Sequence, residues 1–374
     1  MMYVFLPTSG HGRTTPTLSS FLLRCAPTVK KAMAGVHSYH PSPPLPGPLH
    51  RRGDFRRLSR ISAGSKESPS SMPSLSTATS GEEEEKSVAS APSPTLSPPM
   101  GFKIPDPKPY SVRRDKNLDI VTAALPLLFR LGTGLFVLGY SATLVSDDDI
   151  PSNQYAMKVR GSKLKETSKL GPRPQKPIEI YEFESCPYCR KVREIVSILD
   201  LDVLFYPCPR SGPTFRLKVL QMGGKQQFPY MVDPNTGVAM YESDDIIKYL
   251  VDKYGDGTIP LMLSLGPITT LTAMLALIFR LGKGSSYTPS KQPPVPLELW
   301  AFELSPFCKI VREVLVELEL PHLLHSIARG SPKRHEFYQK IGHFQVPYLE
   351  DPNTGVKMFE SAEIIEYLKA TYAL

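Results

Sequence analysis

The sequence predicts an α/β protein with two copies of one domain, each of element order β-α-β-α-β-β-α and each preceded by an apolar helical segment. Three observations predict this class. Short β-like runs alternate with helical periodicity from residue 178 onward. The same pattern returns from residue 297 to the last residue. A pair of cysteines stands where the first strand of the first copy gives way to a helix.

The positive charge of the chain is confined to its beginning. The 374 residues carry a formal net charge of +8, but residues 1–66 hold ten Lys or Arg and a single acid, Asp54. The rest of the chain is close to neutral, with 34 basic and 35 acidic residues. A nucleic-acid-binding domain carries its basic surface on the folded part. We therefore expect no nucleic-acid partner.

The beginning of the chain has the composition of a targeting segment. Residues 1–80 are rich in Ser, Pro and Arg, which is typical of an organelle transit peptide, particularly a chloroplast one, or of a disordered tail. We expect a chloroplast protein, stromal or thylakoid-associated. Residues 81–117 read as a low-complexity linker. Five cysteines with one close pair do not form a disulfide scaffold, so we expect a reducing compartment.

The first copy of the domain is predicted at residues 178–256. A turn of sequence Asp-Pro-Asn-Thr-Gly at 233–237 has the proline, asparagine and glycine expected of a hairpin loop. The predicted strands are 178–183, 202–206, 230–232 and 238–241, and the predicted helices are 187–199, 213–222 and 244–254.

The second copy is predicted at residues 297–374. Its turn at 351–355 repeats the five residues of the first turn without change. Phe359-Glu360-Ser361 and the helix after it match Tyr241-Glu242-Ser243 and its helix. Agreement over this length indicates an internal duplication.

The apolar segments, 118–146 and 257–284, are also copies of each other, and a polar linker is predicted at 147–177. Two interpretations stay open. The runs 120–145 and 259–281 associate with a membrane, and the second run is long enough to span one. Alternatively, both pack against the two domains, since Arg130 in the first run would be costly in lipid.

Cys186 and Cys189 carry the strongest chemical signal. A thiol at a helix start lies near unpaired N–H groups and the positive end of the helix dipole, which lowers its pKa. A second thiol three residues on can close a disulfide, so Cys186 is the expected attacking group and Cys189 the resolving one. A zinc site needs about four ligands, usually with a second close pair, and none exists. We expect no metal.

The tetrapeptide Cys186-Pro187-Tyr188-Cys189 resembles the active site of dithiol glutaredoxins. The Asp-Pro-Asn-Thr-Gly turn and the Glu-Ser helix look like the N-terminal domain of glutathione transferases. Tandem proteins of this hybrid type occur in plants and cyanobacteria. The resemblance implies a thioredoxin-like fold, glutathione as co-substrate, a cis peptide at Phe228-Pro229, and Glu242-Ser243 holding the γ-glutamyl end. Ser243 with the acids after it is also good helix-starting chemistry.

Two features depart from the glutaredoxin pattern. The lysine usually found before the first active cysteine is absent, and Glu184 close to that position would raise the thiol pKa unless Arg190, Lys191 or Arg193 compensates. In the second copy Ser305 replaces the attacking cysteine, so that copy is structural, or holds glutathione as the serine of plant glutathione transferases does. The equivalent residues of the second copy are Ser305, Cys308, Val346, Pro347, Glu360 and Ser361.

The sequence therefore predicts a glutathione-linked thiol–disulfide oxidoreductase whose first domain is active. Its expected partners are glutathione and disulfide-containing proteins. Two alternatives are kept. One is a glutathione transferase or an isomerase resembling the membrane-associated prostaglandin E synthase, which shares a Cys-Pro-x-Cys motif. The other is a docking protein without enzymatic activity.

Overall fold

A computed structural model of the chain describes residues 96–108 and 111–374. The predicted targeting segment lies outside the described residues. The first domain has the predicted element order, which confirms the thioredoxin-like fold class. Its elements are β4 (Ile178–Glu182), α3 (Pro187–Ile198), β5 (Asp202–Pro207), α4 (Phe215–Gly223), β6 (Tyr230–Asp233), β7 (Val238–Met240) and α5 (Ser243–Tyr254).

The second domain repeats the first, element for element. Its elements are β8 (Leu297–Ala301), α8 (Pro306–Glu317), β9 (His322–Ser326), α9 (Lys333–Ile341), β10 (Tyr348–Asp351), β11 (Val356–Met358) and α10 (Ser361–Tyr372). In each domain the hairpin turn is fixed by its aspartate. Asp233 and Asp351 each accept hydrogen bonds from two tyrosines of the last helix. The repeated turn is thus tied to the domain core.

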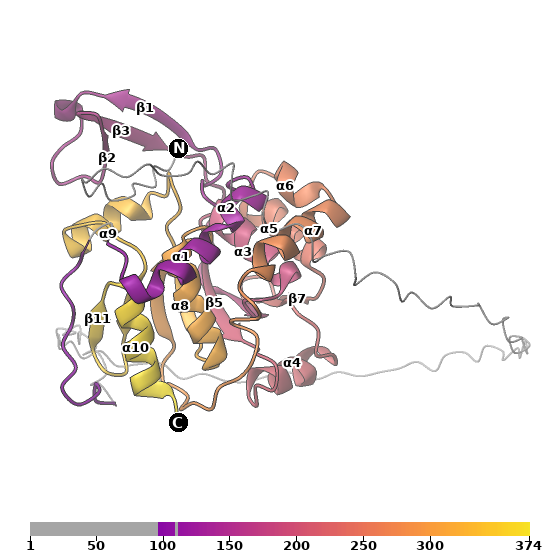
Figure 1. The fold of residues 1–374 in the computed structure, drawn as a ribbon. Helices are drawn as coiled ribbons and strands as arrows, with labels where there is room; N and C mark the ends of the chain where they lie inside the picture. The colour runs from indigo at the N-terminus through magenta and orange to yellow at the C-terminus, as the bar shows by residue number, and fades with distance from the viewer. Residues whose placement is uncertain (1–95, 109–110) are drawn as a thin grey trace, which may run out of the picture. The chain divides into compact units, whose positions relative to one another are not determined.

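The two domains share one eight-stranded sheet of order β11-β10-β8-β9-β5-β4-β6-β7 (Figure 1). They join where β5 pairs antiparallel with β9, with Val203 opposite Leu324. Both strands would be exposed edges in isolated domains, and pairing satisfies their free N–H and C=O groups. The two copies therefore form one continuous sheet rather than two separate domains.

Alternate residues of a strand face opposite sides of the sheet, and each side is covered by its own helices. Ile178 and Ile180 face the main core with α3 and α5. Tyr181 faces the other side and packs with Phe215 and Val219 of α4. The second domain has the same two layers, and the main core continues across the junction.

The apolar segments are only partly helical, and they pack on the domains. The first contains α1 (Asn117–Ala124) and α2 (Pro126–Phe129), and the second contains α6 (Leu261–Ser264) and α7 (Pro267–Ile278). Helix α1 lies against α8, whereas α7 lies against α3. Each longer helix thus covers the domain that it does not precede. Within the described part of the chain no helix has the length and apolarity to cross a bilayer.

Residues 141–167 differ from the expected helix and linker. They form a separate three-stranded sheet of β1 (Ser141–Val145), β2 (Met157–Val159) and β3 (Ser162–Thr167). In its central strand, β3, Lys165 and Thr167 are exposed, whereas Lys163 is buried and donates to the Ile150 carbonyl at 2.6 Å. Figure 1 shows this sheet next to α9, and Arg329 before α9 forms an ion pair with Glu166 (2.8 Å).

The described end of the predicted low-complexity linker also contacts the second domain. Leu96 N–H donates to the Asn353 carbonyl, and the ring of Phe102 lies 5.1 Å from that of Tyr367. Arg113 then pairs with Glu366 of α10. This stretch therefore runs along α10 toward α1.

Candidate active site at the start of α3

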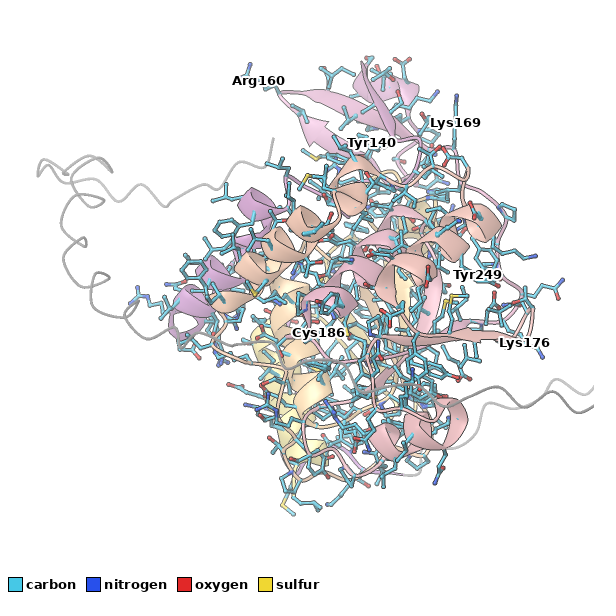
Figure 2. The ribbon with its side chains drawn as sticks, turned by 90° about the vertical axis from the view of Figure 1, so that its right-hand side faces the viewer. Tyr140, Arg160, Lys169, Lys176, Cys186 and Tyr249 are labelled. Atoms are coloured by element: carbon cyan, nitrogen blue, oxygen red, sulfur yellow. The ribbon has the colours of Figure 1, made fainter. Side chains whose placement is uncertain are left out.

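Cys186 lies in the turn between β4 and α3 and is the N-cap residue of α3 (Figure 2). Pro187 occupies the first helical position, where its missing N–H costs nothing. The Cys189 N–H donates to the Cys186 sulfur at 3.2 Å. A thiolate at Cys186 would accept this bond and face the positive end of the helix dipole. The local geometry therefore favours the ionised form of Cys186.

The two thiols of the motif have opposite pKa shifts. The pKa of Cys186 is lowered, chiefly by its interaction with the Cys189 thiol and to a lesser extent by the Cys189 N–H, and burial opposes this. The pKa of Cys189 is raised well above the usual value, chiefly by burial. Both are free thiols, and Cys186 exposes only 4% of its surface. This division suits a nucleophilic first thiol and a protonated second one.

The Phe228-Pro229 peptide bond, next to the third strand, is cis, as the resemblance implies. Phe228 packs edge-to-face on Phe183, the residue after β4, with ring centres 6.2 Å apart. The guanidinium of Arg216 lies 4.7 Å from the Phe228 ring centre and contacts the Phe183 ring as well. Arg216 was missed from sequence, although aligning the copies reveals its equivalent, Arg334.

Glu242 has an unusual backbone, with φ at 64°, a region that residues other than glycine seldom enter. It is the N-cap of α5 but makes no capping bond, so the expected cap at Ser243 is not formed. Ser243 is instead the first helical residue. The exposed Glu242 carboxylate accepts a bond from Gln227 (2.5 Å). Backbone outliers of this kind gather at binding sites, and Glu360 repeats it with φ at 71°.

The second domain repeats the site without its nucleophile. Ser305 is the N-cap of α8 and accepts from the Cys308 N–H at 3.3 Å. Burial raises the pKa of the Cys308 thiol. The Val346-Pro347 bond is cis, and Ser361 begins α10.

The second site is covered by other parts of the chain. The Lys108 N–H donates to the Glu360 carboxylate at 2.6 Å. Together with the residues before α1, Phe307 and Ser361 enclose a pocket of about 90 Å³ at this point. On the other flank, Arg334 donates to the Tyr155 hydroxyl (3.1 Å) from the three-stranded sheet. Ligand access therefore differs between the two copies.

Glu184 does not act as the sequence suggested. It is fully buried between α3 and α8, where Lys309 (2.7 Å), Arg312 (3.2 Å) and Arg193 (3.4 Å) bind its carboxylate. These cations hold its pKa well below the usual value despite the opposing effect of burial. The carboxylate that raises the pKa of Cys186 is that of Glu182, and the positive charge of Arg193 lowers the pKa of Cys186.

Both domains match the family model described as "Glutathione S-transferase, N-terminal domain", at residues 180–258 and 299–374. No curated protein matches the chain. A solved glutathione transferase of Bombyx mori is 30% identical over 22% of this chain and 38% of its own, with a TM-score of 0.21. A trimeric glutathione transferase of Leishmania is 11% identical over 53% of this chain and 67% of its own, with a TM-score of 0.22. The chain thus spans under half the length of the Bombyx mori enzyme, and two of its regions are similar to the N-terminal domain of glutathione transferases.

Proposed function

We propose that the first domain is a glutathione-linked thiol–disulfide oxidoreductase and that Cys186 is its nucleophile. The observation that carries this proposal is the position of Cys186 at the N-cap of α3, where its sulfur accepts the Cys189 N–H at 3.2 Å. The pKa of Cys186 is lowered there and that of Cys189 is raised. A thiol with a lowered pKa is more readily ionised for attack on a disulfide, and a thiol with a raised pKa stays protonated until it is needed. The second domain, with Ser305 at the matching position, has no such nucleophile.

The reaction proceeds in two exchanges. The Cys186 thiolate attacks the glutathione sulfur of a protein–glutathione mixed disulfide, forms a Cys186–glutathione disulfide, and expels the protein thiolate, which takes up a proton. Cys189 then loses its proton, attacks Cys186 and releases glutathione, leaving a Cys186–Cys189 disulfide. Alternatively, a second glutathione attacks the mixed disulfide, releases glutathione disulfide and regenerates Cys186.

Three groups around Cys186 would hold glutathione. The backbone before Pro229 faces the cysteinyl part, and the Glu242-Ser243 pair faces the γ-glutamyl part. The Arg216 guanidinium, which rests on two aromatic rings, is suited to the glycyl carboxylate. The match of this domain to the glutathione-transferase family supports glutathione as the ligand.

A coupled assay with a glutathionylated peptide and glutathione tests this assignment. Cys186→Ser abolishes turnover, whereas Cys189→Ser retains the route in which glutathione resolves the intermediate. Cys208→Ser is the matched control, because Cys208 is a buried thiol of the same domain outside the motif. Turnover by Cys186→Ser at the wild-type rate would refute the proposal.

A transferase is the second candidate, and the family match favours it. In that case the thiol of glutathione bound in the first domain would be ionised and would attack a hydrophobic electrophile. Cys186 would donate a hydrogen bond to the glutathione sulfur. Both activities can be measured on the same preparation, which distinguishes the two candidate functions. Conjugation of an aryl halide without activity on mixed disulfides would favour the transferase.

We propose a plastid location, supported by the basic, Ser- and Pro-rich composition of residues 1–80. A fluorescent protein fused behind residues 1–95 should enter plastids, and retention in the cytosol would refute this. Disulfide-containing plastid proteins would then be the substrates. Trapping with the Cys189→Ser variant, which cannot release a mixed disulfide internally, would recover them.

We also propose that the protein rests on a lipid surface through an apolar face. The face consists of outward side chains of the two apolar segments, all exposed by half or more: Leu118, Val121, Leu128, Leu131, Ile268, Leu271, Ile278 and Leu281. The four of the first segment occupy the same repeat positions as the four of the second. Packing of the core does not require apolar residues at these positions in both segments, because these side chains point away from the domains.

Lipid fits this face better than a protein partner does. Protein interfaces carry about one hydrogen bond per 100–200 Å², and this face is built from aliphatic side chains, with no charged residue from 259 to 279. Exposed Arg114 borders it and suits anionic headgroups, whereas Lys283 on the same border pairs with Asp119. The protein should float with anionic vesicles, and Leu128→Glu with Ile278→Glu should abolish flotation. Leu217→Glu, on α4, is the control. Self-association without vesicle binding would refute the lipid assignment.

A further inference from the structure

The second domain has lost the nucleophile but has kept the charges around it. Four charged positions of α3 and the turn before it recur in the second copy in the same register as Cys186 and Ser305. The pairs are Glu184 with Glu303, Arg190 with Lys309, Arg193 with Arg312, and Glu194 with Glu313. Glu313 has a structural role, because it pairs with Arg280 of the second apolar segment. Glu303, Lys309 and Arg312 instead bind charged groups of the first domain. These three residues therefore connect the second copy to the charged side chains around Cys186.

Arg193 connects this charge cluster to the active site. Its guanidinium forms an ion pair with Glu182, at the end of β4, and donates to the Glu184 carbonyl at 3.1 Å. Both acceptors belong to the turn that leads into Cys186. Arg193 therefore fixes the path of this turn, and its positive charge favours the Cys186 thiolate.

Glu303, from the second domain, completes the binding of Arg193. Its carboxylate accepts from the Arg193 Nε at 3.1 Å, and the same oxygen lies 2.8 Å from Arg312. All three side chains expose 3% or less of their surface. In return, Glu184 of the first domain binds Arg312 and Lys309. Each domain thus supplies a carboxylate that binds cationic side chains of the other domain.

We propose that Glu303 is a positioning residue for Cys186, acting through Arg193. This inference rests on the proposed role of Cys186 as the reacting thiol and assigns the second domain a part in the chemistry of the first. Glu303 holds the guanidinium in place and offsets part of its charge. Arg312 at 2.8 Å and Arg190 at 3.3 Å in turn offset the charge of Glu303. The reactivity of the thiol is therefore set by residues of both copies.

The test is the pH dependence of Cys186 alkylation by iodoacetamide, followed by mass spectrometry on the full chain. Glu303→Gln keeps a hydrogen-bonding group of similar size but removes the charge that offsets Arg193. The pKa of Cys186 should fall by about 1 unit, the shift that one charge about 10 Å away produces at an effective dielectric constant of about 20. Arg312→Gln should shift the pKa upward by a similar amount.

The double variant Glu303→Gln/Arg312→Gln restores the charge balance, so its pKa should return to the wild-type value. A merely structural role predicts the greatest disturbance in the double variant instead. Glu350→Gln is the control, a buried carboxylate of the second domain bound by Lys340 and Lys357, and it should leave Cys186 unchanged. If Glu303→Gln does not fold, Glu303→Asp, which withdraws the carboxylate by one methylene, should give a smaller shift in the same direction.

A Cys186 pKa that is the same in wild type, Glu303→Gln and Arg312→Gln would overturn the inference. So would a double variant that departs from wild type more than either single variant. The measurement needs no substrate, so its failure differs from failure of the proposed function. Inactive wild-type protein with coupled pKa shifts would refute the oxidoreductase, and active protein without the shifts would refute the role of Glu303.

Discussion

Arg130 of the first apolar segment forms a buried ion pair with Glu194 of α3, with 2.6 Å between Nη2 and Oε2 and no exposure of either side chain. Arg280 and Glu313 repeat the pair in the second copy at 2.7 Å. Each arginine also donates to a threonine of the opposite apolar segment, Arg130 to Thr272 and Arg280 to Thr122. Arg130, which would be costly in lipid, thus holds the first apolar segment against α3 through this ion pair.

Removing this anchor should destabilise the whole described unit. Arg130→Met leaves Arg190 as the remaining cation in contact with Glu194. Loss of one partner of a buried ion pair lowers the free energy of unfolding by about 3–5 kcal/mol. Denaturant unfolding measures this change. Lys158→Met, at an exposed pair with Asp147, should cost about 0–1 kcal/mol. Equal losses for the two variants would contradict the buried pair.

The junction between the domains should weaken as pH rises. Burial lowers the pKa of His325 on β9, but hydrogen bonds to Asp202 on β5 and to Glu298 outweigh it and raise the pKa overall. A raised pKa means that the folded protein binds the proton more tightly than the unfolded chain. Its stabilising effect is therefore complete below about pH 6.5, the unfolded value, and is lost as pH rises through the folded value.

Unfolding free energies measured between pH 6 and pH 9 check this expectation. The contribution of His325 has a slope of at most about 1.4 kcal/mol per pH unit. His325→Gln should remove that part of the pH dependence while leaving the rest of the curve. If the wild type and His325→Gln lose stability in parallel, the histidine is not protonated at the junction.

Glutathione should bind at one site per chain. In the first domain the Glu242 carboxylate is exposed, whereas in the second Glu360 already accepts the Lys108 N–H. Titration calorimetry on the reduced full chain gives the stoichiometry. Glu242→Ala should abolish binding, and Glu360→Ala should leave it unchanged. Two equivalent sites in the wild type would show that the segment before α1 does not block the second copy.

The repeated domain and the place of Cys186 could be predicted from sequence because they depend on local signals. Strand and helix periodicities, a cysteine at a strand–helix turn, and a hairpin turn repeated without change are all readable over a few residues. The family match at both regions and the repeated element order agree with that prediction.

What could not be predicted depends on contacts between distant parts of the chain. Arg190, Arg193 and Glu194 belong to residue types that are seldom buried, and the sequence of one copy shows no partners for them. They are buried because Glu303 of the second domain and Arg130 of the first apolar segment bring matching charges to them. The pairing of β5 with β9 and the sheet at 141–167 likewise leave no signal within a single copy.

The start of α3 lowers the pKa of Cys186, and the proposed function depends on this shift. The most direct measurement is the alkylation rate of Cys186 as a function of pH in the reduced full-length protein, resolved by residue. Among the four cysteines of the described residues, Cys186 should react first, with a pKa below the ordinary thiol value of about 8.5, while Cys189, Cys208 and Cys308 should react only on unfolding. A Cys186 that titrates at or above the ordinary value, or that reacts no faster than these three thiols, would contradict the proposed role of Cys186.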